Sequence, residues 1–176
     1  MSDTETSFVF PMYCSPRKQT RLLTAEEKST RYAMAYAHLS LVLEGEENLI
    51  ARMSTAACIM NGLMEFYYWT GFYLVDGEEL VIGPYQGTMG CLRIKKGKGV
   101  CGSCWEKGET ILVPDVHDFP GHITCDTSSK SEIVIPVRNG RGEVIAVFDV
   151  DSDIKYAFDQ LDQSHLEQII ELVGKI

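Results

Sequence analysis

The chain has 176 residues, 45% of them hydrophobic, with a formal net charge of −9 and a sequence pI near 4.9. This length and apolar content suit one globular domain over 1–176 with a full core, in which 1–23 form an amino-terminal extended segment. The acidic balance, without a basic stripe, disfavours a nucleic-acid partner. Without a bilayer-length apolar run or a secretion signal in the first residues, we expect a cytoplasmic protein that has no membrane partner.

Two helices are predicted in the first part of the chain. Over 24–45, Thr24 is a candidate N-cap with Glu27 three residues later, apolar residues then recur at helical spacing, and Gly45 ends the run. The run 46–68 predicts a second, more apolar helix whose methionine stripe is typical of a core.

From Trp69 onward the pattern becomes that of strands. Two β-rich runs flank Asp76-Gly77 in 69–87, and two more flank Asn139-Gly140 in 132–152, which are hairpin signals. Between the hairpins, "CLRI" and "TILVPDV" predict strands separated by a helical turn in "GKGVCGSCWEKGE". An amphipathic helix beginning near Asp159 closes the chain. Successive hairpins with flanking helices predict an α+β fold with a central antiparallel β-sheet covered by helices.

Six cysteines are too many to leave unexplained in a protein expected in a reducing compartment, where a structural disulfide framework is unusual. Cys58 falls in a small and apolar helical run, and we assign it to the core. Cys14 lies in a proline-flanked segment and is interpreted as incidental. The remaining four, which need a function, are Cys91, Cys101, Cys104 and Cys125.

The segment 114–132, "PDVHDFPGHITCDTSSKSE", has no apolar period, yet it concentrates histidines, acids and a cysteine. Irregular segments of this length in compact chains are disordered or functional, and its two prolines favour an ordered, working loop. We interpret His117 as a hydrogen-bonding loop residue. His122, three residues before Cys125, is a secondary candidate for lowering the pKa of that thiol.

Asp149 and Asp151 in "FDVDS" project from the same face of the predicted last strand, because side chains alternate along a strand. Phe148 and Val150 take the opposite face, so the aspartates face something polar. Glu132, at the start of the preceding strand, can join them, and close like charges would raise at least one carboxyl pKa. Taken alone, paired aspartates at a strand end are more often solvent-facing or turn-forming.

The element order resembles that of GAF domains, and four motifs narrow the resemblance. "GVCGSC" (99–104), "LVPDVHDFPGHITCD" (112–126), "SEIVIPV" (131–137) and "VFDVDS" (147–152) resemble the signature of free methionine-(R)-sulfoxide reductases, a GAF-fold enzyme family. The resemblance covers nearly all of the chain from Trp69 onward. Cys104 departs from it, because a small residue without a thiol is usual there.

The resemblance implies an oxidoreductase that reduces free L-methionine-(R)-sulfoxide through a cysteine sulfenic acid and an intramolecular disulfide, without a metal or cofactor. Cys125 is then the attacking thiolate, Cys91 the preferred resolving thiol, and Cys101 a second resolver or exchange partner. Glu132, Asp149 and Asp151 bind the substrate, while Trp69 and Tyr73 wall the pocket around its methylthio group. The expected partners are the free sulfoxide and a thioredoxin-like dithiol reductant, and a homodimer stays open.

Three alternatives compete with this interpretation. "CGSCW" (101–105) fits a papain-type signature, but that signature needs a histidine roughly 130 or more residues later, and fewer residues follow Cys104. A zinc site from Cys101, Cys104, His122 and Cys125 would leave Cys91 unexplained and use an unusual His-x-x-Cys pair. A non-catalytic GAF module sensing a small ligand or redox state is the third, although such modules normally sit in multidomain chains.

Overall fold

The computed structural model describes residues 21–123 and 125–175. Its elements are, in chain order, α1 (Ala25–Val42), α2 (Leu49–Leu63), β1 (Trp69–Asp76), β2 (Glu79–Gln86), β3 (Arg93–Lys95), α3 (Gly99–Lys107), β4 (Ile111–Val113), the 3-10 turn η1 (Val116–Asp118), β5 (Ser131–Arg138), β6 (Val144–Ser152) and α4 (Gln160–Gly174). The predicted α+β class is confirmed. Most of the predicted extended segment 1–23, with Cys14, lies outside the described residues.

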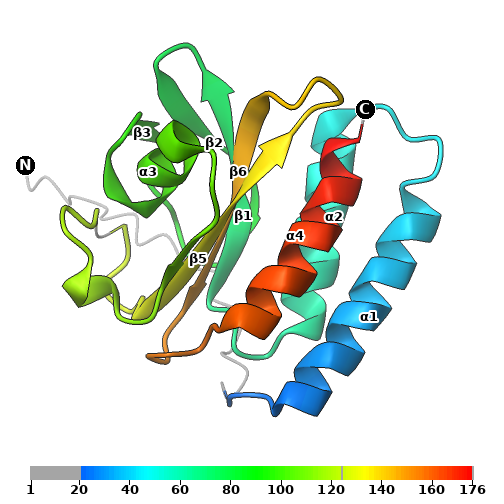
Figure 1. Ribbon diagram of the computed structural model, residues 1–176, viewed down its shortest axis with the longest axis horizontal. Coiled ribbons are helices and arrows are strands. Elements are labelled where there is room, and N and C mark those ends of the chain that lie inside the picture. Colours follow the sequence, from blue (N-terminus) through cyan, green and yellow to red (C-terminus); the bar gives the residue numbers. More distant parts are fainter. Residues whose placement is uncertain (1–20, 124, 176) are drawn as a thin grey trace, which may run out of the picture.

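The strands form one six-stranded antiparallel sheet in the order β3-β2-β1-β6-β5-β4. Helices α2 and α4 pack on one face of this sheet, and α1 packs on those two helices as an outer layer (Figure 1). The opposite face carries α3 and the long loop that precedes β5. Within the described residues, no helix is both long and apolar enough to cross a bilayer.

The helix starts follow the predicted capping chemistry. Thr24 caps α1 and forms a capping box with Glu27, and Asp159 caps α4 with its side chain accepting from two backbone amides. Helix α2 is shorter than the predicted run 46–68: Asn48 caps it, and at Met64 the backbone becomes extended to lead into β1.

Both predicted hairpins are present. Asp76 pairs with Glu79 across a two-residue turn, in which Gly77 has a φ of 62° that favours glycine. In the second hairpin Arg138 pairs with Val144, and the Asn139 side chain accepts hydrogen bonds from two backbone amides of the turn. Turn chemistry therefore sets the register of both strand pairs that flank the centre of the sheet.

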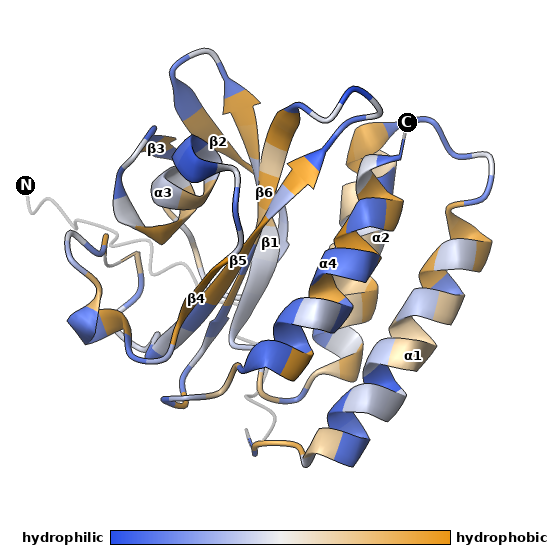
Figure 2. Cartoon of the chain, viewed as in Figure 1, coloured by the Kyte–Doolittle hydropathy of each residue, from blue (hydrophilic) through white to orange (hydrophobic). Residues whose placement is uncertain are grey.

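Two hydrophobic clusters fill the two faces of the sheet. The larger lies under the helices and includes Phe72, Phe148 and Val150, and the smaller lies under α3 and includes Trp69 and Tyr73. Figure 2 shows hydrophobic residues along the middle of β5 and β6, which contribute to both clusters. The alternation of side chains along β6 that the sequence predicts is therefore present. One set of side chains is apolar and faces the helices, and the other set points to the opposite face of the sheet.

The assignment of Cys58 to the core was wrong, because the side chain is exposed. The buried stripe of α2 runs through Met53, Ala56, Ala57 and Met60, and Cys58 points away from it. Residues of α2 are small or apolar on nearly every side, so its periodicity does not distinguish the buried face.

Candidate active site

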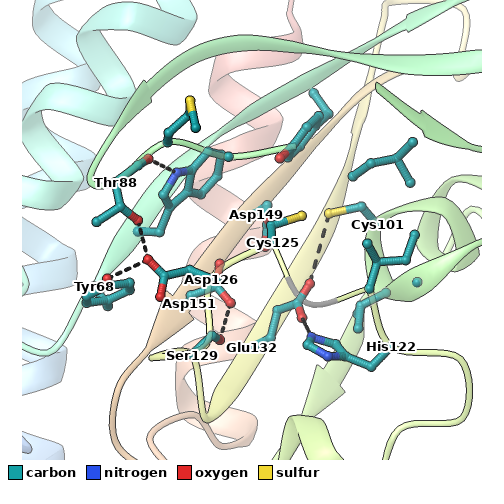
Figure 3. Close-up of a pocket in the computed structure, with 18 of the residues that line it drawn as sticks. Tyr68, Thr88, Cys101, His122, Cys125, Asp126, Ser129, Glu132, Asp149 and Asp151 are labelled. Atoms are coloured by element: carbon teal, nitrogen blue, oxygen red, sulfur yellow. Dashed lines mark hydrogen bonds and ion pairs between the residues drawn. The ribbon is translucent and has the colours of Figure 1, made fainter. Parts of the chain in front are cut away.

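A pocket opens on the α3 face of the sheet. Its floor comes from β1, β5 and β6, and its walls from α3, the segment after β2 and the loop before β5 (Figure 3). The lining residues with ionisable, thiol or aromatic side chains are Tyr68, Trp69, Tyr73, Lys98, Cys101, His122, Cys125, Asp126, Glu132, Asp149 and Asp151.

Cys91 and Cys125 form a disulfide with their Cα atoms 5.4 Å apart. The bond joins the segment between β2 and β3 to the loop before β5, so it links two walls of the pocket across 34 residues of sequence. Cys125 lines the pocket, whereas Cys91 packs against the small hydrophobic cluster behind it. The disulfide therefore lies at the edge of the cavity and joins the two cysteines that were predicted to be redox partners.

Cys101 lies in the first turn of α3, and its side chain is 4% exposed. Its Sγ atom is 4.0 Å from Glu132 Oε1 and lines the same pocket as Cys125. Burial raises the pKa of the Cys101 thiol, and the nearby Asp149 and Glu132 carboxyl groups raise it further. Cys104, fully buried one helical turn later, donates to the Val134 carbonyl at 3.6 Å and does not line the pocket.

Glu132, Asp149 and Asp151 lie side by side on two neighbouring strands. Glu132 pairs with Asp151, and Val134 pairs with Asp149, so directly opposite and alternate positions place all three carboxyl groups on the pocket face. Asp151 also pairs with Trp69 of β1, which brings the aromatic wall beside the acids. Glu132 and Asp149 are 6% and 5% exposed, which is rare for carboxyl groups without a paired cation.

The three acids differ in their partners. Glu132 is approached by His122 Nε2 at 3.4 Å as well as by Cys101, and Asp151 accepts a short hydrogen bond from Ser129 (Figure 3). Asp149 Oδ1 is buried and has no hydrogen-bond partner among the described residues. This oxygen is therefore available to accept a hydrogen bond from a molecule bound in the pocket.

The surroundings of these three carboxyl groups disfavour their negatively charged forms. Burial is the main cause that raises the pKa of both Glu132 and Asp149 well above their ordinary values, and the charge of Asp151 adds to it. Burial also raises the pKa of Asp151 to about 6, although the Ser129 hydrogen bond acts against the shift. The cluster therefore holds its protons more tightly than ordinary carboxyl groups do, and a cationic ligand relieves the repulsion among its ionised groups.

Trp69 and Tyr73 form the aromatic wall, with their rings stacked at 5.7 Å between centroids. The Trp69 ring is fixed by a hydrogen bond from Nε1 to the Thr88 carbonyl at 3.0 Å. Gly71 leaves room for it, because a Cβ atom there would lie 2.7 Å from Trp69 Cη2. Both residues therefore lie in the pocket where the resemblance placed them.

The loop before β5 is tied down at both ends. Val116 N donates to the Lys130 carbonyl, Lys130 N donates to the Ser152 carbonyl, and the Pro114 carbonyl accepts from Tyr156 N. These bonds connect the ends of the loop to each other, to the end of β6 and to the segment that follows β6.

Sequence reasoning missed Asp126 as an organising residue of this loop. Its carboxylate accepts hydrogen bonds from Tyr68 and Thr88, both at 2.7 Å, and from Ser128 N at 2.8 Å. Burial alone would raise the pKa of Asp126, but these hydrogen bonds lower it to about 2. Its place directly after Cys125 was the available signal, whereas contacts from Tyr68 and Thr88 are invisible without the fold. Ser129, the partner of Asp151, was missed for the same reason.

The histidines are placed differently from one another. His117 hydrogen-bonds Asp115 at 2.7 Å, as expected of a loop residue. His122 lies against Glu132, and Cys125, whose thiol pKa it was expected to lower, is bonded to Cys91. That bond also takes Cys125 away from the zinc arrangement considered with Cys101, Cys104 and His122.

The chain matches the model of the GAF domain family over residues 35–176. GAF domain-containing protein A of Dictyostelium discoideum is 45% identical over 147 residues, covering 83% of this chain and 92% of that protein. The free methionine-R-sulfoxide reductase of Saccharomyces cerevisiae is 36% identical over 160 residues, covering 87% of each chain. The solved structure of free methionine-R-sulfoxide reductase from Neisseria meningitidis in complex with its substrate superposes with a TM-score of 0.81 at 34% identity, covering 88% of this chain and 92% of that one.

Proposed function

Because the chain belongs to the GAF-fold family of free methionine-(R)-sulfoxide reductases, which are oxidoreductases, we propose that it reduces free L-methionine-(R)-sulfoxide to L-methionine. One observation supports this activity above the others. A disulfide between Cys91 and Cys125 borders a pocket whose floor carries three carboxyl groups, and Asp149 Oδ1 among them has no hydrogen-bond partner in the described residues.

The pocket matches the free amino acid in two respects. The α-ammonium group of methionine sulfoxide supplies a cation to Asp149 and Asp151, and a hydrogen-bond donor to the unpartnered Asp149 Oδ1. The aromatic rings of Trp69 and Tyr73 offer an apolar surface to the methylthio end. A methionine sulfoxide inside a peptide has no α-ammonium group, so it cannot satisfy the acids.

In the reduced protein, Cys125 attacks the sulfoxide sulfur as a thiolate, because of the two bonded cysteines it is the one that lines the pocket. Burial raises the pKa of the Glu132 carboxyl group, which favours its protonated form, and this group donates a proton to the sulfoxide oxygen. The oxygen passes to Cys125, which leaves methionine and a cysteine sulfenic acid.

Cys91 then attacks the sulfenic sulfur, water leaves, and the Cys91–Cys125 disulfide forms. A thioredoxin-like dithiol protein returns two electrons by thiol–disulfide exchange and restores both thiols. Cys101 serves as a second resolver or exchange partner from the same pocket. This cycle needs a reducing surrounding, and we therefore propose a cytoplasmic enzyme that recovers methionine after oxidative stress.

The experiment that tests substrate recognition compares kcat/KM for free L-methionine-(R)-sulfoxide and its N-acetyl derivative, with a dithiol reductant. We expect the N-acetyl compound to be almost inert, because acetylation removes the cation but keeps the sulfoxide. The methyl ester of the free sulfoxide serves as the matched control, since it blocks the carboxylate and keeps the ammonium group. Comparable kcat/KM for the free and N-acetylated substrates would reject recognition through the acid cluster.

A further inference from the structure

Cys101, Glu132 and Asp149 bring three potential metal ligands to one point. The Cys101 Sγ atom and one oxygen of each carboxyl group all lie within 4.8 Å of one another, and all three side chains are buried. In residues 21–123 and 125–175, this is the one group of three such side chains with ligand spacing. The ligands come from α3, β5 and β6, so the tertiary fold rather than a local motif assembles them.

One oxygen of this group has no hydrogen-bond partner among the residues that the structure describes. Asp149 Oδ1 is buried and unpartnered in the described chain, and the pocket includes it. His122 Nε2 lies 3.4 Å from Glu132 Oε2. An imidazole in this place orients a carboxylate that binds a metal, as ligand-supporting residues do in many metal sites.

We propose that this pocket also binds a thiophilic divalent cation, of which Zn²⁺ is the model, through Cys101, Glu132 and Asp149, and that the ion excludes the amino acid substrate. A thiol and two carboxylates with a fourth position for water match the tetrahedral S and O coordination of zinc. Zinc bonds of about 2.0–2.3 Å place neighbouring ligands roughly 3.3–3.8 Å apart, close to the 4.0 Å between Cys101 Sγ and Glu132 Oε1. Mg²⁺ and Ca²⁺, which prefer oxygen ligands, do not use the thiol.

The ion also balances the buried charge. On binding it displaces protons from the thiol and from the carboxyl groups, and the resulting thiolate and carboxylates surround a dication instead of one another. Exclusion of substrate rests on the proposed function, because it assumes that the α-ammonium group occupies the same acids. Metal binding itself does not rest on that assumption.

The test uses full-length protein with the Cys91–Cys125 disulfide formed, because those two thiols then cannot bind metal. Cd²⁺ is the probe, since a cadmium–thiolate bond gives an ultraviolet charge-transfer band. We expect one equivalent of Cd²⁺ per chain to produce the band and release protons, and Zn²⁺ but not Mg²⁺ to compete. An absent band, or a band removed equally well by Mg²⁺, overturns the proposal.

Matched variants identify the ligands. Cys101→Ser should abolish the band, and Asp149→Asn should weaken Cd²⁺ binding at least about tenfold, as expected for loss of a direct ligand. Cys104→Ser on the same helix and Cys58→Ser on the surface of α2 should leave it unchanged. A band that survives Cys101→Ser in protein with native circular dichroism, or that disappears with Cys104→Ser, contradicts the assignment.

A second experiment distinguishes a failure of the proposed metal site from a failure of the proposed function. L-Methionine, the product of the proposed reaction, is titrated into the cadmium-loaded disulfide form at fixed pH. Loss of the band with rising methionine concentration supports a shared site. Retention of the band overturns substrate exclusion and shows that the ammonium group does not bind to these acids. The metal site is then judged by the results with the variants alone.

Discussion

A carboxylate is buried on each side of the sheet, but the two carboxylates have opposite electrostatic surroundings. On the helix side, between α4 and α1, Asp162 is fully buried, pairs with Lys28 Nζ at 2.5 Å and accepts from Tyr32 at 2.7 Å. On the pocket face, Asp149 is nearly as buried, yet its neighbours are two further acids and one of its oxygens has no partner in the described chain.

The difference separates a structural acid from one that faces a ligand. A buried charge with its own cation stabilises the packing around it only while both partners are present. A buried cluster without a cation costs stability and retains binding capacity for an external one. We therefore expect changes on the helix face to alter folding and changes on the pocket face to alter chemistry.

The largest effect expected on the pocket face comes from Cys125→Ser. This variant should release no methionine even in a single turnover, because no sulfenic acid can form without the attacking sulfur. Cys91→Ser should release about one equivalent per chain and then stall, unless Cys101 replaces it as resolver. Rapid quench with methionine detection measures both, and a full burst from Cys125→Ser with none from Cys101→Ser would move the nucleophile to Cys101.

On the helix face, Asp162→Ala should lower the free energy of unfolding by about 3–5 kcal/mol, because it leaves Lys28 buried without its partner. Urea denaturation followed by circular dichroism measures the change. The folded fraction should keep its kcat/KM, since Asp162 does not line the pocket. A fall in activity of correctly folded protein would break the separation between the two faces.

Asp149→Asn should show the reverse pattern. Losing one charge of the proposed ammonium site should lower kcat/KM by an amount equivalent to about 2–5 kcal/mol. The pKa of Asp149 is raised on folding, so its ionised form destabilises the fold above the ordinary carboxyl pKa, and the amide should fold at least as stably at neutral pH. Parallel melts and steady-state assays test this; a collapsed melt or unchanged turnover would make Asp149 structural.

The smallest effect concerns pH and Asp151, which faces Glu132, Asp149, His122, Asp126 and the Ser129 hydroxyl. Because its pKa is raised to about 6, the charge that attracts an ammonium group develops only as pH rises through that value. The Kd of L-methionine for the disulfide form should therefore tighten between about pH 5 and 7, by at most about tenfold per unit.

The stability contribution has the opposite sign. Folded Asp151 holds its proton to a higher pH than the unfolded chain, so stability should fall as pH rises from about 4 to 6. Calorimetric titrations and melts on wild type and Asp151→Asn check both trends. Identical profiles for the two proteins would show that another group controls them.

Local chemistry made much of the fold predictable from sequence. The capping box of Thr24 and Glu27 and the turn at Gly77 act over a few residues, so their signals are complete in the sequence. Alternation along β6 likewise placed Asp149 and Asp151 on one face. Exposure of Cys58 was unpredictable, because helix α2 lacks a polar side that would reveal its orientation.

The candidate site was predictable only in part. Cys91, Cys101, Cys104 and Cys125 stood out as residue types with redox chemistry, and only the family resemblance selected three of them. Asp149 and Asp151 stood out by alternation. Asp126 did not, because its partners, Tyr68 and Thr88, belong to segments far away in sequence that only the folded sheet brings to the loop. The proximity of Cys101 to the acids likewise depends on how α3 packs over β5 and β6.

The most direct test of the proposed activity is methionine release from the separate R and S epimers of free L-methionine sulfoxide with a dithiol reductant. We predict sustained turnover of the R epimer, little or none of the S epimer, and loss of R turnover in Cys125→Ser. Equal turnover of both epimers, or none of the R epimer by reduced and folded protein, would contradict the assignment of this chain as a free methionine-(R)-sulfoxide reductase.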